Sequence, residues 1–235
     1  RAAMPATSAS APAPRLPDPF QLDDGTRIKT AAQWEPRRAQ IQALLQEVQY
    51  GKAPPAPAKV PVQELSRETL FEGQVMRRRL RLDLGGGATL QVGLTAPAEG
   101  GPYPAIVHID HRPALFSCTL PREVAARGYV LAEFTPTELC PDRPNVNGLL
   151  QKAHPTATWG TIACWAWGAS RVVDLLSQLE QVDRARVTVT GHSRSGKAAL
   201  WAGALDRRIA LTVPMGSGCG GAGSYLIRGP GCERL

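Results

Sequence analysis

The sequence lacks the features that would place it in a membrane, in a zinc-binding class or on nucleic acid. No apolar run approaches the roughly 18 residues that cross a bilayer. The chain has 5 cysteines but no CxxC pair, so a zinc ribbon is not expected. Its net charge is +7, yet no nucleic-acid motif or basic patch interleaved with aromatic residues accompanies that charge. We therefore expect neither a membrane span nor a nucleic-acid partner.

The basic residues and the cysteines are more informative in their local settings. The densest basic run, residues 77–81, reads RRRLR in a predicted strand and predicts a solvated strand face. Cys164 lies in an apolar helical pattern and is expected to be a small buried residue. The other cysteines lie in predicted loops and would pair only in an oxidising compartment; they are Cys118, Cys140, Cys219 and Cys232.

The first residues carry neither an initiator methionine nor the apolar core of a signal peptide. Residues 1–15 are rich in alanine, proline and serine, which is typical of a flexible tail left after a signal peptide is removed. We therefore expect a secreted or periplasmic bacterial protein. Residues 16–235 are of a length that favours one domain.

A predicted helix and an extended connector precede the main sheet. Apolar residues at helical spacing from Trp34 to Val48 predict an amphipathic helix, with Pro36 early enough for a first turn. The segment KAPPAPAKVPV is too rich in proline for a helix or a central strand. Alternating residues at 74–84 and 88–96, joined by three glycines, predict a β-hairpin.

Short apolar runs then alternate with helical stretches, and this order predicts a parallel sheet with crossover helices. An antiparallel hairpin feeding a mostly parallel, doubly wound sheet with helices on both faces is the layout of an α/β-hydrolase. The predicted strands are 105–110, 129–134, 187–190 and 210–215, and the predicted helices lie near 120–127, 160–180 and 196–205. In the second of these helices Trp165 is expected in the core, while Trp167 is left open between core and sugar stacking.

Residues 187–205 read VTVTGHSRSGKAALWAGAL and place Ser193 on a bend between a predicted strand and a predicted helix. A nucleophilic serine needs such a sharp turn at a helix N-terminus, where backbone N–H groups stabilise an oxyanion. Gly191, Ser195 and Gly196 are small enough for the close backbone contacts of that turn. The alternatives are a phosphate cradle or a helix cap, but the spacing is not that of a P-loop.

The histidines do not supply an obvious base for Ser193. An α/β-hydrolase triad runs serine, acid, histidine along the chain, and no histidine follows Ser193 in this sequence. His192 is unsuitable because neighbours on such a turn point apart. His108 and His111 follow a predicted strand and could line the site, and their HxxH spacing is only a weak metal signal. His154 precedes a proline and is expected in a loop.

Four segments, in order from about residue 16 to the end, carry a joint resemblance. They are WEPRRAQIQALLQEVQYGKAP, WAWGASRVVDLL, GHSRSGKAALWAGA and SGCGGAGSYLIRG. Together they are similar to one carbohydrate esterase family, the glucuronoyl esterases (4-O-methyl-glucuronoyl methylesterases). The resemblance implies an α/β-hydrolase that cleaves the ester between 4-O-methyl-glucuronic acid on xylan and lignin alcohols.

The resemblance also implies roles for individual residues. Ser193 matches the nucleophile, Arg194 matches the arginine that stabilises the oxyanion, and Lys197 matches the lysine that contacts the uronate sugar. Lys197 could otherwise be an ordinary surface lysine, although a helix N-terminus disfavours a cation. The family implies no cofactor and no metal, an acidic polysaccharide as the substrate, and a monomer.

The chain departs from the fungal pattern of the family at the triad acid. Fungal members carry a glutamate in PQESGxGG, whereas residues 214–221 here read PMGSGCGG, with Gly216 at that position. Bacterial members resemble this sequence more closely. We expect a fragment in which the triad acid, the histidine and the last strands are missing, so that it is inactive alone and residues 210–215 form an exposed sheet edge. Alternatives are an acetyl-xylan or other carbohydrate esterase and a non-catalytic carbohydrate-binding relative.

Overall fold

The computed structural model describes residues 16–22, 24–111, 119–143 and 146–224, so the predicted tail, residues 1–15, lies outside the described residues. Seven strands form one sheet in the order β1-β2-β3-β5-β4-β6-β7. They are β1 (Val62–Leu70), β2 (Val75–Gly85), β3 (Ala88–Pro97), β4 (Tyr103–Ile109), β5 (Val130–Phe134), β6 (Val182–His192) and β7 (Ile209–Met215). The helices of five or more residues are α1 (Ala31–Leu45), η1 (Gln46–Tyr50), α2 (Thr119–Ala126), α3 (Leu149–Ala153), α4 (Thr161–Leu176) and α5 (Arg194–Leu205).

The sheet changes direction as the sequence predicts. β1, β2 and β3 are antiparallel to their neighbours, whereas β5, β4, β6 and β7 run parallel. The hairpin feeding a mostly parallel sheet is confirmed, and with it the α/β-hydrolase fold. β1 is the strand that the pattern missed, because its residues VQELSRETL do not alternate and are mostly exposed.

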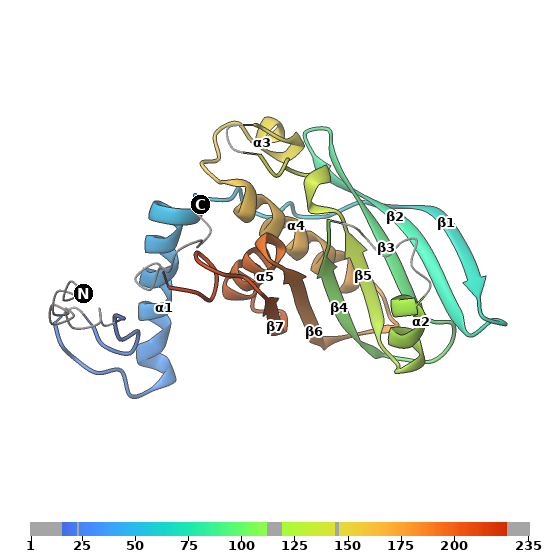
Figure 1. Ribbon diagram of the computed structural model, residues 1–235, viewed down its shortest axis with the longest axis horizontal. Helices are drawn as coiled ribbons and strands as arrows, with labels where there is room; N and C mark the ends of the chain where they lie inside the picture. Colours follow the sequence, from blue (N-terminus) through green and yellow to red (C-terminus); the bar gives the residue numbers. More distant parts are fainter. Residues whose placement is uncertain (1–15, 23, 112–118, 144–145, 225–235) are drawn as a thin grey trace, which may run out of the picture.

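Helices cover the two faces of this sheet. α4 and α5 pack against β4, β6 and β7, and their contact encloses the main core (Figure 1). α2 packs instead against β2, β3 and β5. Trp165 and Trp167 are both buried in the core, so the sugar-stacking alternative for Trp167 is wrong. α4 ends at Leu176, about a turn earlier than predicted.

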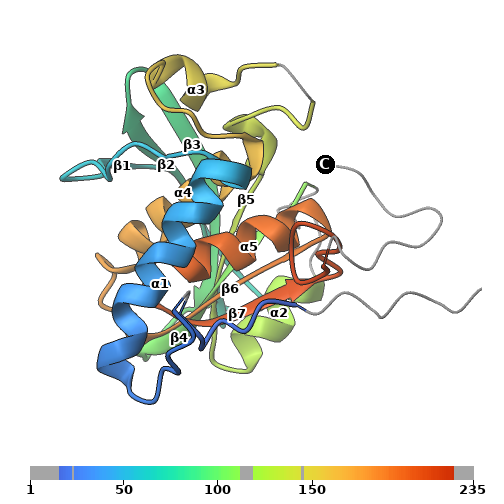
Figure 2. The same ribbon diagram turned by 90° about the vertical axis from the view of Figure 1, so that its left-hand side faces the viewer.

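Helix α1 lies along the outside of the molecule (Figure 2) and buries none of its residues. Its Pro36 falls within the second turn rather than the first. Polar contacts attach the helix, since Arg38 and Gln42 donate to the carbonyl of Ala204 at the end of α5. The predicted apolar face is only partly formed, because Leu44 and Val48 are exposed, whereas Leu45 packs against the core.

The single π-turn η1 connects this outer helix to the core. Its last residue, Tyr50, is buried and stacks on Trp201 of α5 with ring centroids 4.2 Å apart. A π-turn shifts the direction of the side chains that follow it. Tyr50 is thus a buried aromatic contact between the N-terminal segment and the main body.

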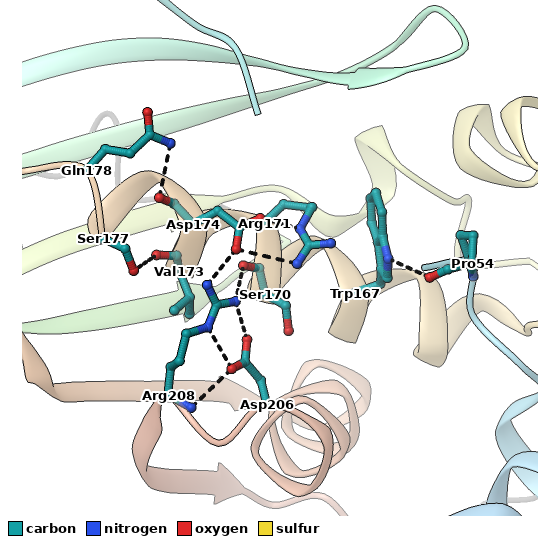
Figure 3. A network of polar contacts seen from close by, with 10 residues as sticks. All are labelled: Pro54, Trp167, Ser170, Arg171, Val173, Asp174, Ser177, Gln178, Asp206 and Arg208. Carbon is teal, nitrogen blue, oxygen red and sulfur yellow. Dashed lines mark hydrogen bonds and ion pairs between the residues drawn. The ribbon is translucent and has the colours of Figure 1, made fainter. Parts of the chain in front are cut away.

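A polar network ties α4 to the loop before β7, and Figure 3 shows its members. Asp174 accepts from Arg208 at 2.7 Å and forms an ion pair with the buried Arg171 at 2.7 Å. Arg208 also donates to Asp206, and the guanidinium of Arg171 lies 4.7 Å from the centre of the Trp167 ring. This network lies at the end of the sheet where the parallel strands begin.

The exposure of the basic run at residues 77–81 and of Cys140 differs from the prediction. Arg77 and Arg78 are half-buried rather than solvated, whereas Arg79 and Arg81 are exposed as predicted, and Arg78 donates to Glu64 on β1 at 2.6 Å. Hydrogen bonds from Arg67 and Arg78 lower the pKa of Glu64 to about 2. Cys140, expected in an open loop, is completely buried. Cys118 and Cys232 lie outside the described residues.

β7 is the outermost strand of the described sheet, as the sequence predicts. Leu211, Val213 and Met215 are exposed along it. Within the described residues, no helix combines the length and the apolar character that a membrane crossing requires.

Candidate active site

Ser193 occupies the turn between β6 and α5, so the predicted strand–turn–helix arrangement is observed. It is the N-cap of α5, and its backbone has φ 56° and ψ −122°. L-residues rarely adopt this conformation, which costs about 1–3 kcal/mol and concentrates at functional sites. The first-turn N–H groups of α5 point toward the end of the helix at which Ser193 lies.

The small residues around Ser193 are required by direct backbone contact. A Cβ atom added to Gly191 would lie 2.6 Å from the carbonyl oxygen of Ser195. One added to Gly196 would lie 2.7 Å from the carbonyl oxygen of Met215, to which the Ser193 N–H donates at 2.9 Å. The turn is therefore clamped between its own helix and the end of β7.

A pocket of about 270 Å³ opens beside this turn. Its walls come from the carboxyl ends of two adjacent parallel strands, β4 and β6, where ligands of α/β proteins commonly bind. The lining residues are His108, Ile109, Asp110, His111, His192, Ser193, Arg194 and Ser195. The structure therefore brings His108 and His111 to the serine, as the sequence suggested, and gathers polar groups around it.

Arg194 lies in the same pocket and is held by a residue that the sequence did not indicate. The carboxylate of Asp142 accepts from Nε of Arg194 at 2.9 Å and from Nη2 at 2.8 Å. A guanidinium bound through two nitrogens has a defined orientation. Because Asp142 is 52 residues away in a loop, no spacing rule could have identified this pair.

A second unpredicted pair includes His108, which lines the pocket. Nδ1 of His108 lies 3.2 Å from a carboxylate oxygen of Glu133, whose side chain is buried. The parallel register of β4 and β5 sets these residues opposite each other. Among the described residues no group of three or more potential metal ligands is found, so the HxxH spacing gains no support as a metal site.

The environment of Lys197 excludes the alternative that it is an ordinary surface lysine. It is only 1% exposed, so it is not an ordinary surface lysine. It lines a second pocket, of about 300 Å³, together with Tyr50, Gly160 and Gly220. The carbonyl of Gly220 accepts from the Tyr50 hydroxyl at 2.9 Å. The burial follows from the packing of η1 and the loop after β7 over α5.

No histidine nitrogen is hydrogen-bonded to the Ser193 hydroxyl within the part of the chain that the structure describes. His192 is exposed and turns toward Gly216, where an added Cβ would lie 3.2 Å from its Nε2. The arrangement therefore offers a nucleophile and oxyanion donors, whereas the general base is not among the contacts of Ser193. The role of each residue in catalysis stays a prediction.

Residues 83–230 match the family model described as "Glucuronyl esterase, fungi". A 4-O-methyl-glucuronoyl methylesterase from Schizophyllum commune is 35% identical over 230 residues, which cover 95% of this chain and 55% of the relative. The chain thus spans about half the length of the curated relatives that it matches.

Solved structures give the same result. A glucuronoyl esterase from Solibacter usitatus superposes with a TM-score of 0.80 at 29% identity, covering 90% of this chain and 66% of that protein. A mutant glucuronoyl esterase from Sporotrichum thermophile, in complex with methyl 4-O-methyl-β-D-glucopyranuronate, superposes with a TM-score of 0.64 at 29% identity, covering 88% and 54%. The bacterial structure is therefore the more similar of these two in backbone arrangement.

Proposed function

The chain belongs to the glucuronyl esterase family, and on that premise we propose that it supplies the nucleophile side of a serine esterase acting on glucuronoyl esters. The substrates would be esters of 4-O-methyl-glucuronic acid on xylan with lignin alcohols, or the simple methyl ester of that acid. The observation that carries the proposal is Ser193, which is held at φ 56° at the start of α5 and lines a pocket.

In the proposed first step, Oγ of Ser193 forms a bond to the acyl carbon while its proton passes to a general base. Negative charge develops on the carbonyl oxygen. The backbone N–H of Arg194 and its guanidinium stabilise that charge. The carboxylate of Asp142 keeps the guanidinium in one orientation, which lowers the reorganisation needed at the transition state.

In the second step the carbon–oxygen bond to the alcohol breaks, and the alcohol leaves with the proton from the base. Water then attacks the acyl-enzyme, the uronic acid is released and the Ser193 hydroxyl is restored. No redox change occurs, and the resemblance implies no cofactor in either step.

Lys197 is proposed to hold the uronate sugar. Its ammonium is almost completely buried, and a buried cation interacts more strongly with polar ligand groups than an exposed one. The sugar would therefore approach from the pocket that Lys197 lines with Tyr50 and Gly220.

We propose that the base and its carboxylate partner are contributed by residues other than those that the structure describes. This is supported by the lack of a histidine contact to Ser193 in the described part of the chain. The 235 residues alone are accordingly expected to be inactive, and the measurement that checks this is ester hydrolysis by the 235-residue chain beside the natural full-length protein.

The central test uses the natural full-length protein and the methyl ester of 4-O-methyl-glucuronic acid. Ser193→Ala should lower kcat by about 10³-fold or more, because the nucleophile is lost while binding is kept. A serine-directed fluorophosphonate should label the parent protein and not this variant. Undiminished hydrolysis by Ser193→Ala would refute the assignment.

Two other functions differ in measurable ways. An acetyl-xylan esterase would not need Lys197 to bind a uronate. In that case Lys197→Ala would leave the rates of hydrolysis of acetyl esters and of glucuronoyl esters equally unchanged. A non-catalytic carbohydrate-binding relative is favoured only by the missing base contact at Ser193. Such a protein would bind glucuronoxylan, and its full-length form would hydrolyse no ester.

We also propose that the protein is monomeric and is exported to the periplasm or the medium, as the composition of residues 1–15 suggests. Gel filtration and cell fractionation test these two points.

A further inference from the structure

The segment that follows β5 packs two buried residues against one face of α4. Leu139 fits over Gly168, where an added Cβ would lie 2.3 Å from its Cδ1. One turn earlier on the same helix, the thiol of Cys164 lies beside the thiol of Cys140. Both cysteines are completely buried, and both are free thiols in the structure.

Three further contacts keep Cys140 against Cys164. The indole nitrogen of Trp165, the next residue along α4, donates to the carbonyl of Cys140 at 2.9 Å. The N–H of Cys140 donates to the carbonyl of Pro136 at 3.3 Å. Behind it, a Cβ added to Gly148 would lie 2.4 Å from Cα of Cys140. The backbone around Cys140 thus has no room to withdraw from the helix.

We propose that Cys140 and Cys164 form a disulfide when the protein folds in an oxidising compartment. A small disulfide such as oxidised glutathione is the oxidant. The two thiols lose two protons and two electrons, one sulfur–sulfur bond forms, and the oxidant is reduced to two glutathione thiols. Cys219, the other described cysteine, is half-exposed, and its sulfur contacts the carbonyl of Ser224 instead.

The burial of the pair determines when this bond forms. Thiolate is the reacting species, and burial, together with the neighbouring Cys140, raises the pKa of the Cys164 thiol. Oxidation is therefore slow once the chain has folded and fast while the segment is still open to solvent. For the same reason, a bond that has formed is shielded from reductants.

The bond would act on the candidate active site through the chain. Asp142 lies two residues after Cys140 and accepts twice from Arg194, beside Ser193. A covalent link at Cys140 shortens the length of chain over which Asp142 can move. The disulfide is thus expected to stabilise the position of the Asp142–Arg194 pair.

The test requires no enzyme activity, so its failure is distinguishable from failure of the proposed esterase function. The natural full-length protein is refolded with reduced and oxidised glutathione, and its cysteines are mapped by mass spectrometry after alkylation of free thiols. The expected result is a peptide pair joining Cys140 to Cys164. Free thiols at both positions, or a link from either to another cysteine, would overturn the proposal.

Matched variants separate the pair from the other cysteines. The triple variant C118S/C219S/C232S should still form the bond as a monomer, and C164S should not. Oxidation should raise Tm by about 5–10 °C, because a disulfide that closes the loop between Cys140 and Cys164 constrains the unfolded chain. Backbone amides at 139–143 should exchange more slowly in the oxidised protein, and equal exchange rates would contradict the link to Asp142.

Discussion

The turn at Ser193 and the outer helix α1 are held in place by different forces. Around the turn, Gly191 and Gly196 leave no space for a methyl group, and the atoms that fill that space are backbone. α1 buries none of its residues and is attached mainly through side-chain hydrogen bonds and ion pairs, with Leu45 packed against the core at its last residue. The first region resists any change of shape, whereas the second tolerates many side chains.

This difference shows which contacts fix the position of the candidate nucleophile. Backbone atoms cannot rotate away from a clash, so the clamped turn fixes the Ser193 hydroxyl within a small volume. Long polar side chains at the surface have many alternative rotamers and lose entropy when they pair. Accuracy at the candidate site therefore depends on the residues between β6, α5 and β7 and not on α1.

The largest effect is expected for Gly191→Ala. The new methyl group would meet the carbonyl of Ser195 at 2.6 Å, and relief requires β6 and α5 to separate, at a cost of about 3 kcal/mol or more. Urea unfolding measures the loss. The control is Gly87→Ala in the hairpin turn, where φ is 79° and nothing lies nearby, so about 1 kcal/mol is expected. Equal losses would show that backbone contact does not set this turn.

An intermediate effect is expected for Asp206, which lies in the partly buried network before β7. Burial raises the pKa of Asp206, but hydrogen bonds from Arg208 outweigh it and hold the pKa below the usual value. The ionised form therefore adds stability above the unfolded pKa of 3.8, and this is lost as the pH falls through the folded value. Asp206→Asn should lose about 1 kcal/mol at pH 7.

The pH dependence distinguishes this ion pair from simple packing. The difference in unfolding free energy between the parent protein and Asp206→Asn should shrink as the pH is lowered from 5 toward about 2–3. A difference that stays constant over that range would mean that the charge of Asp206 contributes nothing.

The smallest effect is expected for Glu35→Gln on α1. Glu35 pairs with Arg207, and both side chains are exposed. Exposed pairs contribute little because water and salt screen them, so the unfolding midpoint should stay within measurement error. A loss comparable with that of Gly191→Ala would show that α1 is fixed as firmly as the turn.

The sequence predicted the features that depend on local pattern. The alternating runs and the glycines of the hairpin identified two strands, and short apolar runs identified four more. β1 was missed because VQELSRETL shows no alternation. The turn at Ser193 followed from the sizes of Gly191 and Gly196, since the clash that excludes larger residues arises within a few positions of the chain. Clashes between residues that are close in the sequence can be predicted from that short segment alone.

Features that depend on distant packing could not be predicted. Asp142 and Arg194 meet only because the segment after β5 docks on α4. Lys197 is buried because η1 and the loop after β7 close over it, and neither packing leaves a signal near residue 197. The same reason explains why the burial of Cys140, which does lie in a loop, could not be predicted.

At Ser193 the backbone conformation lowers stability, while the side chain that bears this cost is the proposed nucleophile. Glycine adopts φ 56° without the penalty that serine bears, so Ser193→Gly should unfold at a higher temperature than Ser193→Ala, although both lack the hydroxyl. A chain selected only to fold would carry glycine here. A strained serine at this position therefore supports the proposed role of Ser193 as the nucleophile, on an observation that does not depend on the substrate.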